Sequence, residues 1–337
     1  MPVNAYAAME KGGKLEPFEY EFGDLGFDEV ELEIESCGIC HSDMSMIDNE
    51  WGFSTYPLVP GHEVVGKVTK TGDGVKAVQV GQRVGLGWFA ESCRRCRPCL
   101  SGHHNLCTNS TATIVGRHGG FADRVRASEL WCIPIPDSVD AVTAGPLFCG
   151  GATVFNPLVQ YEVSPMDRVG IIGIGGLGHL ALQFARAWGC EVTAFTTSDD
   201  KAQQAKDLGA HHVANTRDEG TLKKLRGSFD LILNTTAVGL PWSDYVGALC
   251  AKGRFVNVGG NVEEPISVGA FDLIGQEKRV GGSGLAPPVI MQRMLEFCGR
   301  HGIAPITDRF SMDDCNDGMQ HLRDGKARYR VVLTRQP

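Results

Sequence analysis

The sequence lacks the segments that direct a chain across or into a membrane. Residues 1–10 contain no basic stretch followed by an apolar core, so we expect no secretory signal peptide and a cytoplasmic protein. No apolar run approaches the roughly 20 residues of a membrane span, which excludes an integral membrane protein. The sequence also contains no internal repeat.

Positively charged residues are also relatively few. The 32 Lys and Arg residues are outnumbered by 40 Asp and Glu residues, which gives a net charge of −8. Nucleic-acid-binding proteins usually carry a basic footprint, so nucleic-acid binding is not expected as the main role. The composition, 42% hydrophobic and 21% charged, is typical of a soluble globular enzyme, and 337 residues favour two domains.

Cysteine is plentiful, with 12 residues, and four of them lie close together in one polar segment. In a chain without export signals, cysteines indicate metal ligands and reduced thiols rather than a disulfide framework. The segment has too little apolar material for a core, and a tetrahedral four-thiolate zinc would replace one. Two disulfides or an iron–sulfur cluster are the alternatives. The predicted structural-zinc ligands are Cys93, Cys96, Cys99 and Cys107.

A second candidate metal site combines Cys40 with His62. Each lies on a loop at the end of a predicted strand, the first strand covering residues 30–36 and the second 64–69. A thiolate and a neutral imidazole suit zinc, and three protein ligands with an open fourth position make a catalytic site. Cys149 would be the third ligand. The alternative is that all three are ordinary buried thiols and a loop histidine.

The predicted secondary structure divides the chain. Residues 1–150 form short strands with glycine-rich turns, which indicates a β-rich domain. Residues 151–286 contain strands that alternate with helical segments, which predicts an α/β doubly wound parallel sheet. Residues 287–337, with a helix over 289–298 and a strand over 329–333, are predicted to return to the first domain. A ligand is expected in the cleft between the two domains.

A G-x-G-x-x-G motif follows the first strand of the predicted parallel sheet and precedes a helix. In this context the glycines let the backbone approach a pyrophosphate, which the helix N-terminus binds through its amides and dipole. The alternative is a glycine-rich turn that serves packing only. The predicted cofactor-binding residues of this loop are Gly173, Gly175, Gly176, Leu177 and Gly178.

The end of the second strand of that sheet lacks the Asp or Glu that would bind the ribose hydroxyls of NAD. Small hydroxyls and a lysine one turn into the next predicted helix can bind the 2′-phosphate of NADP instead. The hydroxyls could equally cap that helix, and the acidic pair at 199–200 opposes the prediction by offering ribose ligands. The predicted 2′-phosphate ligands are Thr196, Thr197, Ser198 and Lys201.

Together these segments resemble the zinc-dependent medium-chain alcohol dehydrogenases, and more narrowly the cinnamyl-alcohol-dehydrogenase branch with its bacterial broad-range NADPH-dependent aldehyde reductases. The resemblance covers nearly the whole chain and includes residues 37–43, 61–63, 146–154 and 325–330, the four-cysteine segment and the glycine loop. It implies a GroES-like catalytic domain, a Rossmann domain, NADP(H) and two zinc ions per chain, with the catalytic zinc on Cys40, His62 and Cys149.

The resemblance also implies a mechanism, in which the zinc acts as a Lewis acid on the aldehyde oxygen and nicotinamide supplies the hydride. Asp43 and Glu63 would be carboxylates behind the metal, with Glu63 at times a ligand itself. Ser42 matches the hydroxyl residue that protonates the nascent alkoxide. In many relatives a histidine passes that proton onward, but Ser45 stands here, so a water, the ribose hydroxyl or Asp48 would replace it.

Further positions complete the predicted site. Thr153 matches a position packed against nicotinamide, and Val258 and Ser283 are added to the cofactor site. Trp51 and Trp88 could line an apolar substrate pocket, although large aromatics more often belong to a core.

The predicted function is therefore reversible, zinc-dependent reduction of aldehydes to primary alcohols by NADPH. One alternative is an NAD-dependent secondary-alcohol or polyol dehydrogenase of the same superfamily. The other is a non-catalytic, zinc-stabilised structural protein. The family's habit also implies a homodimer or homotetramer with a sheet-edge contact between nucleotide domains.

Overall fold

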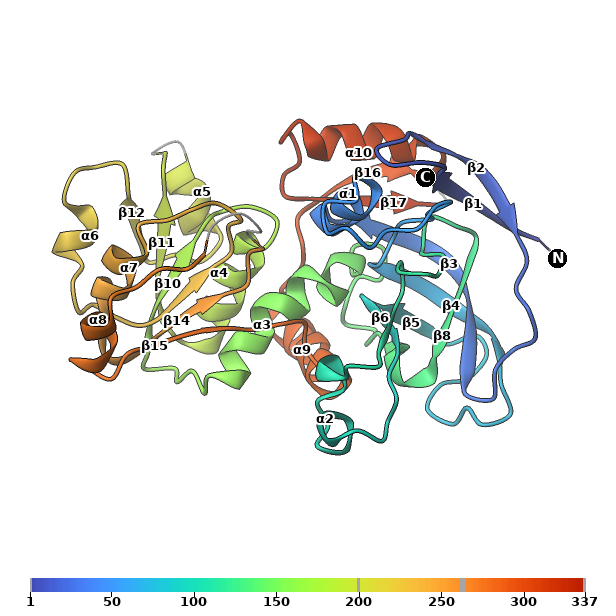
Figure 1. Ribbon diagram of the computed structural model, residues 1–337, viewed down its shortest axis with the longest axis horizontal. Helices are drawn as coiled ribbons and strands as arrows, with labels where there is room; N and C mark the ends of the chain where they lie inside the picture. Colours follow the sequence, from blue (N-terminus) through green and yellow to red (C-terminus); the bar gives the residue numbers. More distant parts are fainter. Residues whose placement is uncertain (1, 199–200, 261–264, 336–337) are drawn as a thin grey trace. The chain divides into compact units, whose positions relative to one another are not determined.

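The chain folds into two compact units, each built around its own sheet (Figure 1). The computed structural model describes residues 2–198, 201–260 and 265–335. One unit comprises Met1–Ala152 and Leu285–Pro337, and the other comprises Thr153–Gly284. Within these described ranges, no helix has the length and apolar character needed to cross a membrane.

The first unit contains a seven-stranded sheet in which the two ends of the sequence meet. The last strand, β17 (Arg330–Thr334), pairs antiparallel with β3 (Glu29–Ile39) and places Leu333 opposite Cys37 (Figure 1). The returning segment therefore completes the sheet beside the strand that leads to Cys40. The other strands of this sheet are β16 (Thr307–Ser311), β4 (Val64–Thr71), β5 (Arg83–Leu86), β9 (Ile133–Pro134) and β8 (Arg124–Ser128), the last paired with β3.

Strand β3 shows why this segment forms a strand. Val30, Leu32 and Ile34 alternate along it and are all at most 2% exposed, which confirms the predicted apolar face. Glu31 is also buried, at 1% exposed, which the alternation did not predict. Its charge is compensated by ion pairs to β4 and β8, so the opposite face of this part of the sheet is covered too.

Short helices and two small sheets complete the first unit. The predicted helix 289–298 is α9 (Pro288–His301), which begins at a proline and ends before Gly302, whose φ of 65° is the left-handed cap conformation. Besides four short 3-10 helices, the other described elements are α1 (His41–Ile47), α2 (Arg97–Leu100), α10 (Cys315–Arg323), the pair β1 (Val3–Ala8) and β2 (Leu15–Tyr20), and the pair β6 (Phe89–Glu91) and β7 (Thr111–Ala112).

The second unit is a six-stranded, fully parallel sheet, which confirms the predicted doubly wound fold. The fifth strand begins at Leu249, five residues before its predicted start at 254, because residues 249–253 enter the sheet through a register shift. In sheet order the strands are β12 (His212–Asn215), β11 (Glu191–Thr196), β10 (Arg168–Ile172), β13 (Phe229–Asn234), β14 (Leu249–Asn257) and β15 (Arg279–Gly282).

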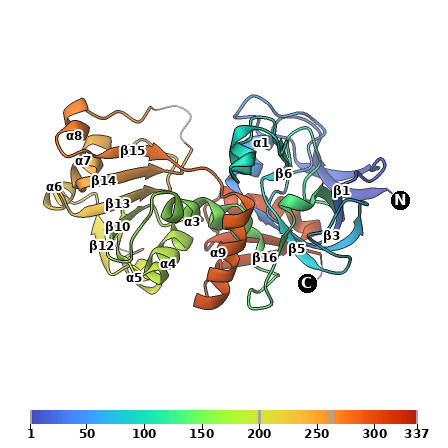
Figure 2. The same cartoon turned by 90° about the horizontal axis from the view of Figure 1, so that it is seen from below.

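Helices cover both faces of this sheet because parallel strands need crossover connections (Figure 2). One core cluster packs Phe195, Phe229, Tyr245 and Phe255 with Trp242, and the rings of Phe195 and Tyr245 meet edge to face at 5.3 Å. The helices are α3 (Gly150–Gln160), α4 (Gly178–Trp188), α5 (Ala202–Asp207), α6 (Thr221–Lys224), α7 (Trp242–Ala248) and α8 (Ala270–Ile274).

Candidate active site

The four cysteines predicted as structural-zinc ligands lie together in the first unit. Their sulfur atoms all lie within 4.8 Å of one another, with Cys93 Sγ 4.0 Å from Cys99 Sγ, and Cys96 Sγ 3.8 Å from Cys107 Sγ. Thiolates bound at roughly 2.3 Å around a tetrahedral zinc would lie about 3.8 Å apart, so the spacing fits the ion. All four cysteines are free, so the structure contains neither of the two alternative disulfides.

Backbone amides favour negative charge on these sulfurs. Cys93 Sγ accepts a hydrogen bond from the Cys96 amide at 3.4 Å, and Cys107 Sγ accepts one from the Cys93 amide at 3.4 Å. Hydrogen bonds from the Arg95 and Cys96 amides lower the pKa of the Cys93 thiol to about 6. The segment therefore supplies the four sulfur donor atoms and also amides that compensate part of the negative charge of a thiolate cluster.

A second group of metal-binding side chains, also in the first unit, consists of Cys40, His62, Glu63 and Cys149, whose ligand atoms all lie within 4.8 Å. Cys149 Sγ is 3.8 Å from Cys40 Sγ and 3.3 Å from His62 Nε2. Cys40 follows β3 and caps α1, whereas His62 precedes β4. Cys149 follows the short 3-10 helix Gly145–Phe148. The fold thus joins two thiols and an imidazole, a donor set that fits zinc.

Asp43 fixes the orientation of this group from behind. Its carboxylate is fully buried, and Oδ1 accepts hydrogen bonds from His62 Nδ1 at 2.8 Å and from the Gly61 amide at 2.9 Å. Oδ2 accepts one from the Cys40 amide at 2.9 Å. Because Nδ1 donates to Asp43, His62 presents Nε2 towards the sulfurs. Gly61, with φ +101°, must be glycine because a Cβ would lie 2.6 Å from Phe121 Cδ1.

Glu63 faces Arg330, a residue to which sequence reasoning assigned no role. Both are buried, and Arg330 Nη2 pairs with Glu63 Oε1. Burial raises the pKa of Glu63 to about 7 despite the opposing charge of Arg330. The other oxygen, Glu63 Oε2, is buried without a hydrogen-bond partner, as expected for a group next to a cation site. In the sequence, Arg330 stands at the start of an apolar strand and ends the segment 325–330 of the resemblance, but neither observation gives it a partner.

The predicted proton-transfer residues lie on or next to α1. Ser42 is half-buried in the first turn, two residues after Cys40. Ser45 is buried and donates a hydrogen bond to Glu50 Oε2 at 2.6 Å. Asp48, proposed from the sequence as a substitute for the missing histidine, forms a bidentate ion pair with Arg323 at 2.8 and 3.0 Å. Ser45, which replaces the histidine, and Asp48, one of the three predicted substitutes for it, are therefore both already bonded to other residues.

Trp51 and Trp88 form an aromatic wall beside the second metal group rather than a separate core. The Trp88 ring meets the His62 ring edge to face at 5.0 Å and meets Trp51 at 5.8 Å. Trp51 in turn stacks on Phe53, which is 48% exposed. Neither tryptophan is fully buried. A row of aromatic rings thus extends from His62 to the exposed Phe53, which suits a substrate with an apolar group.

The glycine loop of the second unit has the expected strand–turn–helix setting between β10 and α4. Gly173 has φ +89°, and a Cβ there would lie 2.5 Å from Thr236 Cγ2. A Cβ on Gly178 would lie 1.8 Å from the Gly173 carbonyl oxygen, so both positions require glycine. The turn between them is open to a ligand, since Gly175 is exposed and a Cβ on it would meet nothing within 4 Å. The other turn residues are the half-buried Gly176 and Leu177.

The residues predicted to bind a 2′-phosphate follow β11, but they are not equivalent. Thr196 is buried, and its hydroxyl donates to the Ser198 carbonyl at 3.1 Å and accepts from the Ser198 amide at 3.2 Å. Thr197 is exposed and Ser198 half-buried. Lys201, also exposed, directly precedes α5 (Ala202–Asp207). Residues 199–200 lie outside the described residues.

The remaining predicted cofactor residues lie at ordered positions of the second unit. The Val258 amide donates to the Asn234 carbonyl at 3.0 Å. Ser283 Oγ accepts a hydrogen bond from Asn156 Nδ2 of α3 at 3.0 Å. Thr153, in the first turn of α3, is half-buried. The hydroxyl of Ser283 is therefore held by the protein itself, whereas Thr153 retains an accessible surface.

Comparison with known proteins identifies the family. The alcohol dehydrogenase GroES-like domain matches residues 26–137, and the zinc-binding dehydrogenase domain matches residues 176–300. The chain is 50% identical to aldehyde reductase AdhA of Synechocystis sp. over 98% of both chains. The chain belongs to the zinc-dependent medium-chain alcohol dehydrogenases. This confirms the resemblance drawn from the sequence and makes the protein a zinc-type alcohol dehydrogenase or aldehyde reductase that acts on small molecules.

Two solved structures show the same branch of the family. A cinnamyl alcohol dehydrogenase from Sorghum bicolor has a TM-score of 0.93 at 35% identity, over 99% of this chain and 98% of that one. The enzyme of the same name from Helicobacter pylori, solved with NADP(H), has a TM-score of 0.89 at 29% identity over 99% of each chain. The GroES-like and Rossmann-like fold predicted for this dehydrogenase is therefore confirmed.

Proposed function

We propose that this dehydrogenase reduces aldehydes to primary alcohols reversibly, with NADPH as hydride donor and two zinc ions per chain. The observation that carries the proposal is the group of Cys40, His62 and Cys149, whose donor atoms converge while Asp43 holds the imidazole in place. Two thiolates and one imidazole leave a fourth position open for a substrate oxygen. The other four cysteines form the closed, all-sulfur set typical of a structural ion.

In this proposal the protein provides orientation and charge at the substrate oxygen. A zinc ion bound by Cys40, His62 and Cys149 would supply Lewis acidity towards a carbonyl. Asp43 keeps the His62 ring in one tautomer and orientation, and the Glu63–Arg330 pair places a buried counter-charge behind the sulfurs. These fixed groups need no reorganisation as charge develops on the oxygen, which is the usual source of electrostatic catalysis.

Ser42 is the proposed proton donor to the product alkoxide. It lies two residues after Cys40, in the first turn of α1, and it is half-buried rather than sealed off from solvent. Ser45 and Asp48 are bonded to Glu50 and Arg323, so we propose that the proton reaches Ser42 from water or from the ribose hydroxyl of the cofactor. A hydroxyl suits this task because it donates one proton and accepts another.

The proposed preference for NADPH over NADH rests on the end of β11. No carboxylate stands at Thr196, so the ribose hydroxyls of NAD lack their usual partner and a 2′-phosphate meets no repulsion there. The buried Thr196 shapes the turn through Ser198, whereas Thr197 and Lys201 are exposed and can contact the phosphate. The related enzyme solved with NADP(H) supports the same cofactor here.

The decisive test is a panel of aldehydes and alcohols assayed with NADPH and NADH in parallel. We expect the highest kcat/KM for aldehydes of apolar, aromatic character with NADPH, because Trp88 contacts His62 and Trp51 in turn contacts Trp88. A kcat/KM with NADH that equals or exceeds the value with NADPH would refute the cofactor assignment. A preference for polyols or secondary alcohols would refute the substrate assignment. We also propose a homodimer or homotetramer, which sedimentation velocity would establish.

A further inference from the structure

Two asparagines link neighbouring strand ends in the second unit. Asn234 is the last residue of β13 and Asn257 the last of β14, and the two are paired in the sheet register. Asn234 is 1% exposed, and its Nδ2 donates to Asn257 Oδ1 at 2.6 Å. The two amides, one buried and one half-buried, thus form a cross-link at the carboxyl edge of the sheet, where β13 and β14 lie side by side (Figure 2).

Each asparagine also holds the loop that follows its own strand. Asn234 Oδ1 accepts hydrogen bonds from the Thr236 amide at 3.1 Å and from the Thr236 hydroxyl at 2.8 Å. Asn257 Nδ2 donates to the Gly259 carbonyl at 2.7 Å. The loops themselves are in contact, because a Cβ on Gly259 would lie 1.8 Å from the Thr236 carbonyl oxygen. The pair therefore fixes two loops with one uninterrupted chain of hydrogen bonds.

These loops adjoin the glycine loop at the point where the strand order of the sheet reverses. The order runs β12-β11-β10 on one side and β13-β14-β15 on the other, so the switch lies between β10 and β13. Thr235 Oγ1 donates to the Ile172 carbonyl at 2.7 Å, and Thr236 lies against Gly173. In open α/β sheets a dinucleotide binds across the strand ends at this switch, one mononucleotide half on each side.

We propose that Asn234 and Asn257 are positioning residues for the nicotinamide half of the cofactor. The inference rests on the proposed function, because that function places the 2′-phosphate, and so the adenosine half, beyond β11. The nicotinamide half then lies over the loops after β13 and β14, which the asparagine pair holds. The pair acts through the loops of Thr236 and Gly259 rather than by touching the reacting atoms.

The chemistry of the pair explains why amides are required. Each side chain must donate with its nitrogen and accept with its oxygen for the chain of bonds to run from Thr236 to Gly259. Aspartate at 234 would set a carboxylate against Asn257 Oδ1. Aspartate at 257 would set one against the Gly259 carbonyl oxygen. Each replacement keeps the shape of the side chain but turns one donor into an acceptor and buries a charge.

The test compares two ligands on the full-length, zinc-loaded enzyme. NADPH spans both halves of the site, whereas adenosine 2′,5′-bisphosphate occupies only the adenosine half. For Asn234→Asp and Asn257→Asp we expect the Kd of NADPH to rise roughly tenfold to a hundredfold, the effect of losing one or two buried hydrogen bonds. The Kd of the bisphosphate is expected to stay within about twofold, because β11 and its loop are untouched.

Asn49→Asp is the matched control. Asn49 lies just after α1 in the first unit, and its Oδ1 accepts a hydrogen bond from the Ser54 amide at 3.0 Å, which an aspartate retains. We expect both ligands to bind this variant normally. If the aspartate variants of the pair fail to fold, the double variant Asn234→Ala and Asn257→Ala removes both partners without burying a charge and must show the same split between ligands.

The outcomes separate this inference from the function on which it rests. Equal weakening of NADPH and of the bisphosphate, or normal binding of both with only a lower Tm, would mean that the pair stabilises the unit without positioning nicotinamide. An unmodified enzyme that prefers NADH would refute the cofactor proposal instead. The comparison would then use NADH and AMP. The variants of the asparagine pair would be expected to weaken the binding of NADH and to leave the Kd of AMP nearly unchanged.

Discussion

Ser42 and Ser45 lie about one turn apart in α1 and differ in what their hydroxyls contact. Ser45 is buried and bonded to Glu50, so its proton is already committed, whereas Ser42 is half-buried beside Cys40. Ser42→Ala is expected to slow the chemical step by roughly 10²–10⁴-fold, the usual range for a general acid. Ser45→Ala serves as the control and should change that step by only a few fold.

Single-turnover oxidation of bound NADPH by a simple aldehyde measures that step, because product release cannot then limit the rate. The solvent isotope effect, measured alongside, reports proton transfer directly. If Ser42→Ala turned over at a near-normal single-turnover rate, the alkoxide would take its proton from another source.

Lys201 is the only charged residue among the proposed 2′-phosphate ligands. Loss of a charge-assisted hydrogen bond costs roughly 1.5–3 kcal/mol, so Lys201→Ala should weaken NADPH about tenfold to a hundredfold and leave NADH nearly unchanged. Lys206→Ala, at an exposed lysine inside α5, is the matched control. Thr196→Asp should shift preference towards NADH, since a carboxylate repels the phosphate. The Kd values of NADPH and NADH for each variant test these expectations. If Lys201→Ala weakened the binding of NADPH and NADH equally, the assignment of Lys201 to the 2′-phosphate would be wrong.

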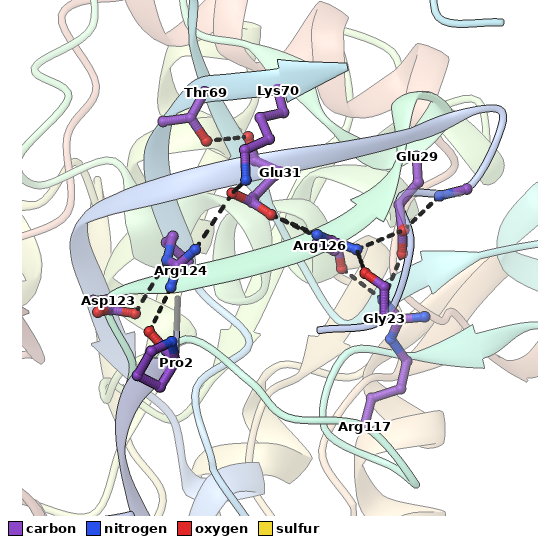
Figure 3. A network of polar contacts seen from close by, with 11 residues as sticks. Pro2, Gly23, Glu29, Glu31, Thr69, Lys70, Arg117, Asp123, Arg124 and Arg126 are labelled. Atoms are coloured by element: carbon purple, nitrogen blue, oxygen red, sulfur yellow. Dashed lines mark hydrogen bonds and ion pairs between the residues drawn. The ribbon is translucent and has the colours of Figure 1, made fainter. Parts of the chain in front are cut away.

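At the scale of elements, an ion-pair network joins three strands of the first unit around Glu31 (Figure 3). Glu31, on β3, accepts hydrogen bonds from Arg126 of β8 at 2.8 and 2.9 Å and from Lys70 of β4 at 2.9 Å. Arg126 also donates to the Gly23 carbonyl at 2.9 Å and lies over the Phe22 ring, 4.3 Å from its centre. The network therefore ties the segment after β2 to the main sheet.

This network makes stability depend on pH in a definite direction. Burial by itself would raise the pKa of Glu31, but the hydrogen bonds from Lys70 and Arg126 outweigh it and lower the pKa. A folded-state pKa below the unfolded value means that Glu31 stabilises the fold above the unfolded pKa, roughly 4.3, and that this contribution is lost as pH falls through the folded pKa.

Glu31→Gln is therefore expected to lower the free energy of unfolding by about 1–3 kcal/mol at neutral pH, and the deficit should shrink in acid as the native Glu31 becomes protonated. Glu33→Gln, at an exposed position of the same strand, controls for the change of side chain. Urea denaturation of both variants and of the unmodified protein, at neutral pH and at about pH 3, measures the free energy of unfolding. A deficit that is the same at both pH values would show that packing, and not charge, is responsible.

The strands that carry the site residues explain which parts of the site could be predicted from the sequence. Cys40 and His62 were predicted because each lies at the end of a strand with a clear apolar pattern, and strand ends are local properties. Arg330 was not, because its partner Glu63 is 267 residues away and is reached only when β17 pairs with β3. Asn234 was missed for a related reason, since its partner depends on the register between β13 and β14.

Boundaries of short elements were also beyond the reach of local patterns. The predicted helix start near 199 falls outside the described residues, and Lys201 directly precedes α5, which begins at Ala202. Glu31 occupies a position in β3 that alternation assigns to solvent, but long-range pairs with Arg126 and Lys70 make its burial tolerable. Charged and amide side chains whose partners come from other strands are thus the ones that local sequence reasoning misses.

For the whole molecule, the two metal groups predict two zinc ions with separable roles. Cys40 belongs to a group held by Asp43, Arg330 and two strands, so the fold around it persists without the ion. Cys96 belongs to a segment held together mainly by its own sulfurs, with α2 only four residues long. We therefore expect Cys40→Ser to bind one zinc, to lose turnover and to keep its affinity for NADPH.

Cys96→Ser should instead lose the other zinc and damage folding, because removing a ligand from a four-thiolate site also removes the cross-link that replaces a core. Cys250→Ser, at a half-buried thiol bonded to Asp230, is the control and should retain both ions. Elemental analysis, Tm and the Kd of NADPH on all three variants separate the two roles.

Fully active enzyme that contains one zinc or none would contradict the two-ion proposal. A Cys40→Ser variant that lost stability as severely as Cys96→Ser would contradict the division of roles. The order of loss under a chelator gives an independent measure, because activity should disappear with the ion at Cys40 while the Tm falls only when the ion at Cys96 is removed.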